Sequence, residues 1–71
     1  MTTKVELETD GNFWKVLVAE GDKVAEGDTL FIMEVMKMEV PYEAPCDGVV
    51  TTLNVAEGDI GKEGDIVLEI G

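Results

Sequence analysis

The chain reads Gly11-Asn12-Phe13-Trp14-Lys15-Val16-Leu17-Val18-Ala19-Glu20-Gly21-Asp22 near its beginning, a β-rich run that closes on a Gly-Asp turn. The same pattern returns as Gly48–Asp59, at an offset of 37 residues. The match continues without a gap, because Glu26-Gly27-Asp28 returns as Glu63-Gly64-Asp65. An ungapped internal repeat predicts two similar supersecondary units. With only two copies, one pseudo-twofold domain over residues 1–71 is favoured over a solenoid.

The rest of the chain has the pattern of an all-β protein, with short β-rich runs separated by Gly-Asp turn signals. Each Gly can adopt a positive φ without a Cβ penalty, and each Asp can bond back to nearby amides. The four symmetric pairs are therefore interpreted as turns and not as metal or phosphate sites. We predict strands, including two short extended pieces, at residues 4–8, 12–19, 23–24, 28–35, 38–43, 48–56, 60–61 and 65–70.

Length and composition limit the classes of function. A chain of 71 residues has a thin core and little room for a catalytic cleft. Its net charge of −11 repels phosphate backbones and anionic lipids, so we expect neither nucleic acid nor a membrane as a partner. No signal peptide or membrane-spanning run is visible, and a lone cysteine fits a reducing compartment, so we expect a cytoplasmic protein. The first strand follows Met1 without a linker, which favours a free-standing protein.

The side chains that usually carry catalysis are missing or ordinary. Without any histidine, the chain has no Ser-His or Cys-His nucleophile and no His metal site, so we expect neither an enzyme nor a metal centre. Cys46 follows a Pro turn and is interpreted as a small buried hydrophobe. Four further residues are assigned to core or edge packing rather than to a ligand platform: Phe13, Trp14, Phe31 and Met33.

One lysine differs from these ordinary features. Lys37 lies between the two copies of the repeat and between Met36 and Met38, at the predicted turn of a hairpin. A two-residue hairpin turn favours Asn-Gly or Asp-Gly because it needs φ > 0, and Met36-Lys37 supplies neither. Two Met side chains at a tip gain little from burial but offer adaptable apolar contact. The turn is therefore interpreted as the display of a primary amine that another enzyme reaches and acylates.

The stretch Glu34-Val35-Met36-Lys37-Met38-Glu39 resembles the biotin-attachment motif of biotin carboxyl carrier domains, whose common form is Glu-Ala-Met-Lys-Met. The resemblance covers essentially the whole chain, including the Gly-Asp turns on either side of the motif. It implies a flattened β-barrel, or sandwich, of two four-stranded antiparallel sheets with quasi-twofold symmetry. That architecture agrees with the internal repeat.

The resemblance also implies a role for each residue of the motif. Lys37 would carry covalent biotin on its ε-amine, and a biotin protein ligase would read Glu34, Val35, Met36 and Met38. The domain would be the non-catalytic carboxyl carrier of a biotin-dependent carboxylase, such as an acyl-CoA carboxylase. Its partners would be the biotin carboxylase that loads the carboxyl group and the carboxyltransferase that receives it.

The chain departs from the family pattern at several points. Val35 replaces the usual Ala, and the turn at residues 8–12 lacks the family's Ala-Pro and Pro-Gly. No insertion lies between Gly21 and Gly27, so the protruding thumb of some bacterial carriers is absent. Two other functions stay open. One is a lipoyl carrier domain, which shares the fold but resembles Asp-Lys-Ala at the site; the other is an unmodified interaction module.

Gly61 falls where the first half has Val24, so one apolar contact of the repeat is missing. With φ < 0 at Gly61, Gly61→Val is expected to be neutral or to stabilise by up to about 1 kcal/mol, because Gly adds entropy to the unfolded chain. With φ > 0 the same change is expected to destabilise. The repeat favours the first outcome.

Overall fold

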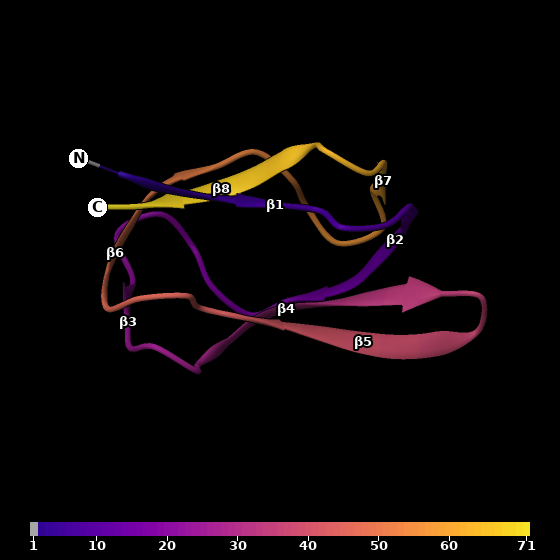
Figure 1. Ribbon diagram of the computed structural model, residues 1–71, viewed down its shortest axis with the longest axis horizontal. Coiled ribbons are helices and arrows are strands. Elements are labelled where there is room, and N and C mark those ends of the chain that lie inside the picture. Colours follow the sequence, from indigo (N-terminus) through magenta and orange to yellow (C-terminus); the bar gives the residue numbers. More distant parts are fainter. Residues whose placement is uncertain (1) are drawn as a thin grey trace.

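Strands make up all the regular structure of the computed structural model, which describes residues 2–71 (Figure 1). In order they are β1 (Thr3–Glu6), β2 (Gly11–Val16), β3 (Lys23–Val24), β4 (Thr29–Val35), β5 (Met38–Glu43), β6 (Gly48–Leu53), β7 (Ile60–Gly61) and β8 (Ile66–Ile70). They form two four-stranded sheets, ordered β1-β8-β6-β3 and β5-β4-β2-β7, in which every strand pair is antiparallel. The expected all-β fold is confirmed. No helix that could cross a membrane is present in residues 2–71.

The first strand, expected at 4–8, is Thr3–Glu6, and the largest differences from the predicted strand ends lie at two equivalent places. The run expected at 12–19 ends as a strand at Val16, and its copy ends at the equivalent residue. The Asp22 carboxylate accepts a hydrogen bond from the Ala19 amide at 2.9 Å, and the second copy repeats this bond at 3.0 Å. These local bonds draw the chain into the Gly-Asp turn before the apolar pattern ends.

The offset of 37 residues relates the ladders as well as the sequence. Phe13 pairs with Met33 in one sheet, and the equivalent Val50 pairs with Ile70 in the other. A β-bulge follows at the same place in both pairs. The pairing of β5 with β4 likewise repeats that of β1 with β8, although these sequences are not alike. The structure therefore confirms the quasi-twofold symmetry and extends it beyond the repeat visible in the sequence.

The core lies between the two sheets and is apolar. Its buried members are Val5, Leu7, Phe13, Val24, Leu30, Phe31, Met33, Ala44, Val50, Val67, Leu68 and Ile70. Phe13, Phe31 and Met33 are at most 1% exposed, which confirms their assignment to the core. Trp14 is an exposed residue of β2, and Cys46 is half-buried against the core rather than fully buried.

Gly61 corrects one expectation. Its φ is not positive, yet the residue is buried and its surroundings are full. A Cβ at Gly61 would overlap the Leu7 Cδ1 atom and lie 2.8 Å from the Phe13 Cε2 atom. Real Cβ atoms do not approach neighbours this closely, so a valine would overpack the core. The structure removes the ground for expecting Gly61→Val to be neutral or stabilising, because the space that a valine would fill is already occupied.

The two halves divide the same core volume differently. Where the second half has Gly61, the first half has Val24, which is buried. The offset of 37 residues pairs Leu7 with Ala44 and Phe13 with Val50, so the larger members of both pairs lie around Gly61. The symmetry therefore predicts that Val24, a larger residue than Gly61, lies among the smaller equivalents Ala44 and Val50.

Gly61→Val is expected to lower the free energy of unfolding by about 1–3 kcal/mol through overpacking. Leu7→Ala alone opens a cavity and is expected to cost about 2–5 kcal/mol. The double variant should cost less than the sum of the two, because the valine fills space that the shortened Leu7 vacates. Urea unfolding of the wild type, both single variants and the double variant measures this coupling. Strictly additive losses would show that the two side chains do not share the space.

Candidate functional site

The hairpin of β4 and β5 turns through only two residues, Met36 and Lys37. Val35 and Met38 form the last cross-strand pair before the turn. Met36 has a φ of 51° and Lys37 a φ of 66°, and no other non-glycine residue in 2–71 has a positive φ. Positive φ at both central residues is the geometry of a type I′ turn. Residues with a Cβ adopt it at a cost of about 1–3 kcal/mol each, so the hairpin tip is strained.

Lys37 projects from the barrel at the end opposite the chain termini. Figure 1 shows the hairpin extending beyond the sheets on the right, while the N- and C-terminal ends lie together on the left. At the tip, Met36 is 91% exposed and Met38 is 68% exposed. Apolar side chains this exposed contribute little to the core, so their presence at the tip indicates contact with another molecule.

The other residues expected to guide a ligase lie in different surroundings. Glu34 is exposed and lies directly opposite Glu39 in the ladder, where two carboxylates repel each other. Val35 is partly buried and packs against the core. The structure therefore displays Glu34 with Glu39 on one face of the hairpin and turns Val35 inward on the other. The valine that replaces the family's usual alanine adds a contact inside the protein.

Gly11 supports the base of the hairpin, and the sequence pattern does not mark it as part of the site. A Cβ at Gly11 would lie 2.7 Å from the Glu34 carbonyl oxygen and 2.9 Å from the Val35 Cγ2 atom. Only glycine lets β2 approach β4 this closely. Its position at the head of the repeat is the feature that could reveal it, because Gly48 makes the matching close approach to Gly71 in the other sheet.

The site presents an acceptor group without the means to activate it. Lys37 offers a primary amine, and the chain contains no histidine that could serve as a base. Among residues 2–71, no cluster of His, Cys, Asp or Glu side chains could hold a metal ion. Lys37 can therefore accept an acyl group that a second enzyme has activated.

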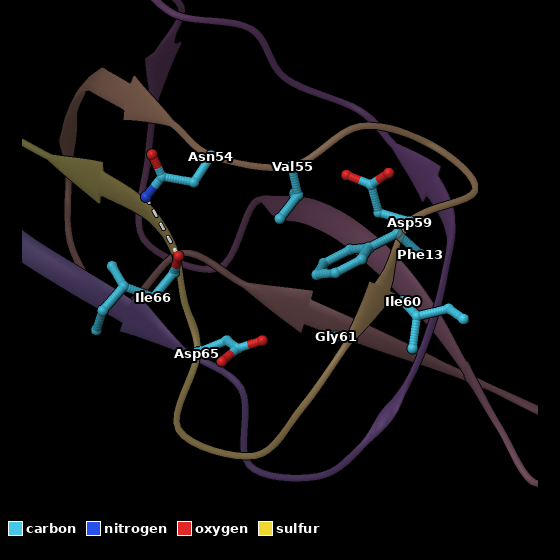
Figure 2. Close-up of a pocket in the computed structure, with 8 residues that line it drawn as sticks. All are labelled: Phe13, Asn54, Val55, Asp59, Ile60, Gly61, Asp65 and Ile66. Atoms are coloured by element: carbon cyan, nitrogen blue, oxygen red, sulfur yellow. Dashed lines mark hydrogen bonds between the residues drawn. The ribbon is translucent and has the colours of Figure 1, made fainter.

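A shallow hollow of about 390 Å³ lies beside β7 and does not include the hairpin tip (Figure 2). It is lined by Phe13, Asn54, Val55, Asp59, Ile60, Gly61, Asp65 and Ile66. The Asp59 and Asp65 carboxylates each accept a hydrogen bond at 3.0 Å from an amide of their own turn. The Asn54 side-chain amide donates to the Ile66 carbonyl at 3.2 Å. These polar groups stabilise turns, so the hairpin and not the hollow is the candidate site.

Comparison with known proteins agrees with this geometry. Residues 3–70 match the model of the Biotin_lipoyl family, described as biotin-requiring enzyme. The chain belongs to the biotin/lipoyl attachment family. Because the match spans both sheets and the hairpin, it applies to the attachment domain as a whole.

Two relatives have nearly the same length as this attachment domain. The biotin/lipoyl attachment protein of Bacillus subtilis is 42% identical over 66 residues, which are 93% of this chain and 90% of the relative. The biotinylated protein TB7.3 homolog of Mycobacterium leprae is 37% identical over 70 residues, 99% of either chain. The solved structure of the Kluyveromyces lactis urea carboxylase matches with a TM-score of 0.91 at 35% identity, over 100% of this chain and 6% of that one.

The family membership agrees with what the hairpin offers. A displayed amine without an activating group belongs to a carrier, and this attachment domain is a non-catalytic carrier domain of the kind found in biotin-dependent carboxylases. The sequence predicts this class through the resemblance of residues 34–39 to a biotin-attachment motif, and the missing histidine argues against an enzyme.

Met36→Asn is expected to raise the free energy of unfolding by about 0.5–1 kcal/mol, because asparagine tolerates the left-handed conformation that a type I′ turn requires. Met38→Asn is the control, since Met38 is an exposed strand residue at which the same side chain relieves no strain. Urea unfolding compares the two variants with the wild type. A loss of stability in Met36→Asn would show that Met36 makes contacts that outweigh the strain of the turn.

Proposed function

We propose that this attachment domain carries biotin on Lys37 and moves a carboxyl group between the two active sites of a biotin-dependent carboxylase. The observation that carries the proposal is the display of Lys37 at a strained turn between two exposed Met residues. The family match supports biotin as the cofactor. A carrier needs one acceptor amine that other enzymes can reach, and the hairpin tip supplies it.

Attachment forms one amide bond. The neutral ε-amine of Lys37 attacks the carboxyl carbon of an activated biotin, the leaving group departs with its bonding electron pair, and the nitrogen loses a proton. A biotin protein ligase must supply the activated biotin, because a free carboxylate has no leaving group for an amine to displace. The exposure of Lys37 supports this step, since its Nζ atom has to come within about 3–3.5 Å of the carbon inside another protein.

The contribution of the protein to carboxyl transfer is positional. Bound biotin supplies the nitrogen that holds the carboxyl group, and the domain keeps that group tethered. Tethering raises the effective concentration of the group at a biotin carboxylase that loads it and at a carboxyltransferase that accepts it. The hairpin extends beyond the sheets, which leaves Lys37 free to enter two different sites in turn (Figure 1).

The proposed partners are therefore a ligase and the two enzymes of a carboxylase, in the cytoplasm. The net charge of −11 supports protein partners over nucleic acid or an anionic membrane. A lipoyl carrier would share the fold and the hairpin lysine, but the Met residues on both sides of Lys37 favour biotin. An unmodified module is disfavoured, because Met36-Lys37 strains a turn that Asn-Gly would form more easily.

Lys37→Arg is expected to abolish biotin incorporation, because a guanidinium is a far poorer acyl acceptor than an amine. The measurement is an avidin blot of the variant after co-expression with a biotin protein ligase. Lys62→Arg is the matched control, since Lys62 also lies exposed beside a turn and should leave incorporation intact. Biotin that persists in Lys37→Arg would overturn the assignment of the site.

Intact-mass analysis after co-expression with a biotin ligase or a lipoyl ligase distinguishes three functions: a biotin carrier, a lipoyl carrier and an unmodified module. We expect a single biotinyl addition to the wild type. A lipoyl addition alone would support the lipoyl carrier, and an unchanged mass with both ligases would support the unmodified module.

Met38→Ala is expected to slow biotin incorporation with little change in thermal midpoint. Met38 is 68% exposed, so its truncation should cost well under the roughly 2–5 kcal/mol of a buried Met→Ala change. Met33→Ala is the control, because Met33 is fully buried in the same hairpin and should lose stability. A large fall in the midpoint of Met38→Ala with unchanged incorporation would show that Met38 serves the fold.

A further inference from the structure

The offset of 37 residues gives every residue of 1–34 a counterpart in 38–71. Comparing the two halves therefore shows which surface residues the fold requires. Four positions on the outer face of the β5-β4-β2-β7 sheet are apolar, and we name them the outer patch: Trp14, Ile32, Pro41 and Ile60. The offset of 37 residues takes them, in that order, to Thr51, Glu69, Lys4 and Lys23 on the other sheet. Every apolar position of the patch is thus polar in its counterpart.

The strand register places the outer patch away from the core. In β4, Ile32 lies between the buried residues Phe31 and Met33, so its side chain points to the outer face of the sheet. On that face, Ile32 pairs with Pro41 of β5 and with Lys15 of β2. Ile60 is 76% exposed and Trp14 is 45% exposed. None of the four belongs to the buried core or to the apolar residues packed against it. The Lys15 ammonium lies over the Trp14 ring, 5.5 Å from its centroid.

The fold does not need an apolar surface here. The second sheet forms the same ladders with Thr, Glu and Lys at the equivalent positions. Ile60 and Pro41 are exposed, Trp14 is 45% exposed and Ile32 is half-buried, so much of this apolar surface faces water and gains little from burial in the monomer. Neighbouring apolar side chains on such a surface commonly mark a contact with another molecule. Comparison of the two sheets therefore indicates that the fold does not require apolar residues at the positions of the outer patch.

The outer patch lies close to the hairpin tip and has an acidic border on that side. Ile32 is three strand residues from Val35, about 10 Å at about 3.3 Å per residue, and the two-residue turn with Lys37 follows directly. Glu34 and Glu39 lie side by side between them, and both are exposed. A protein interface covers about 800 Å² on each partner, so one partner that holds the tip can also cover the outer patch.

We propose that the outer patch docks the enzyme that acylates Lys37, through an apolar surface flanked by basic side chains that meet Glu34 and Glu39. This inference rests on the proposed function. An enzyme that acylates the amine must bring its active site to Nζ itself, and its body then lies against the adjoining sheet. An enzyme that acts on the far end of a long attached group has no such constraint.

A second copy of this chain is a poorer occupant of the outer patch. Two patches that met face to face would bring together two borders of Glu34 and Glu39, in molecules that each carry a net charge of −11. A basic partner surface removes this repulsion and speeds encounter. The charge therefore favours a different protein over self-association.

Steady-state biotinylation by a purified biotin protein ligase, with the whole domain as the varied substrate, tests the proposal. Trp14→Thr/Ile60→Thr should raise the KM for the domain about ten-fold or more and leave kcat within about two-fold, because docking energy is lost while Lys37 is unchanged. Thr51→Ala/Lys23→Thr is the matched control at equivalent positions of the other sheet, and it should leave both constants unchanged. Adding salt should raise the wild-type KM, since the acidic border is exposed.

Ile60→Thr alone keeps the test valid if the double variant loses stability, because Ile60 is 76% exposed and its truncation leaves the core intact. An unchanged KM in a folded Ile60→Thr variant that is still biotinylated on Lys37 would overturn the docking site and leave the proposed function standing. Wild-type dimers in sedimentation that Trp14→Thr/Ile60→Thr abolishes would assign the patch to a second copy and overturn the proposal. Absence of biotin on the wild type would instead reject the proposed function.

Discussion

Each Gly-Asp turn forms two backbone hydrogen bonds with a core residue of the opposite half. The rest of the structure depends on these hydrogen bonds between the halves. The Gly21 amide donates to the Val50 carbonyl at 2.8 Å, and the Val50 amide donates to the Asp22 carbonyl at 2.9 Å. The other three turns hold, in the same way, Phe13, Ala44 and Leu7. The Gly of each turn has a φ between 88° and 94°, which side chains with a Cβ rarely adopt. Neither half can therefore complete its turns without the other.

This mutual hold explains why a strained turn can persist at the hairpin tip. β4 is the central partner of both β5 and β2, so the base of the hairpin is fixed by ladders on two sides. Gly11 brings β2 against that base more closely than any other residue would allow. The cost of positive φ at Met36 and Lys37 is then met by cooperative packing elsewhere in the barrel. The hairpin base is therefore fixed on two sides, and Lys37 lies at its tip.

The departures from symmetry are as informative as the symmetry itself. Inside the barrel, Gly61 is surrounded by Leu7 and Phe13, whereas the offset of 37 residues gives Val24 the smaller equivalents Ala44 and Val50, so the two halves distribute side-chain volume differently. Outside the barrel, one sheet presents the outer patch and the other presents polar residues. The first difference serves packing, because a dense core tolerates only matched exchanges. The second lies outside the buried core, on the sheet that carries Lys37.

The sequence by itself determined the features that depend on short-range pattern. Alternating β-rich runs and Gly-Asp turns predicted the all-β fold, the repeat predicted two equivalent halves, and Met36-Lys37 marked the hairpin tip. Tertiary structure decided what depends on contacts between distant segments. It turned Val35 inward, made Gly61 intolerant of a side chain, and aligned Trp14, Ile32, Pro41 and Ile60 on one face. The physical reason is that strand period and turn chemistry are local, whereas the space left for a side chain is set by residues far away in the chain.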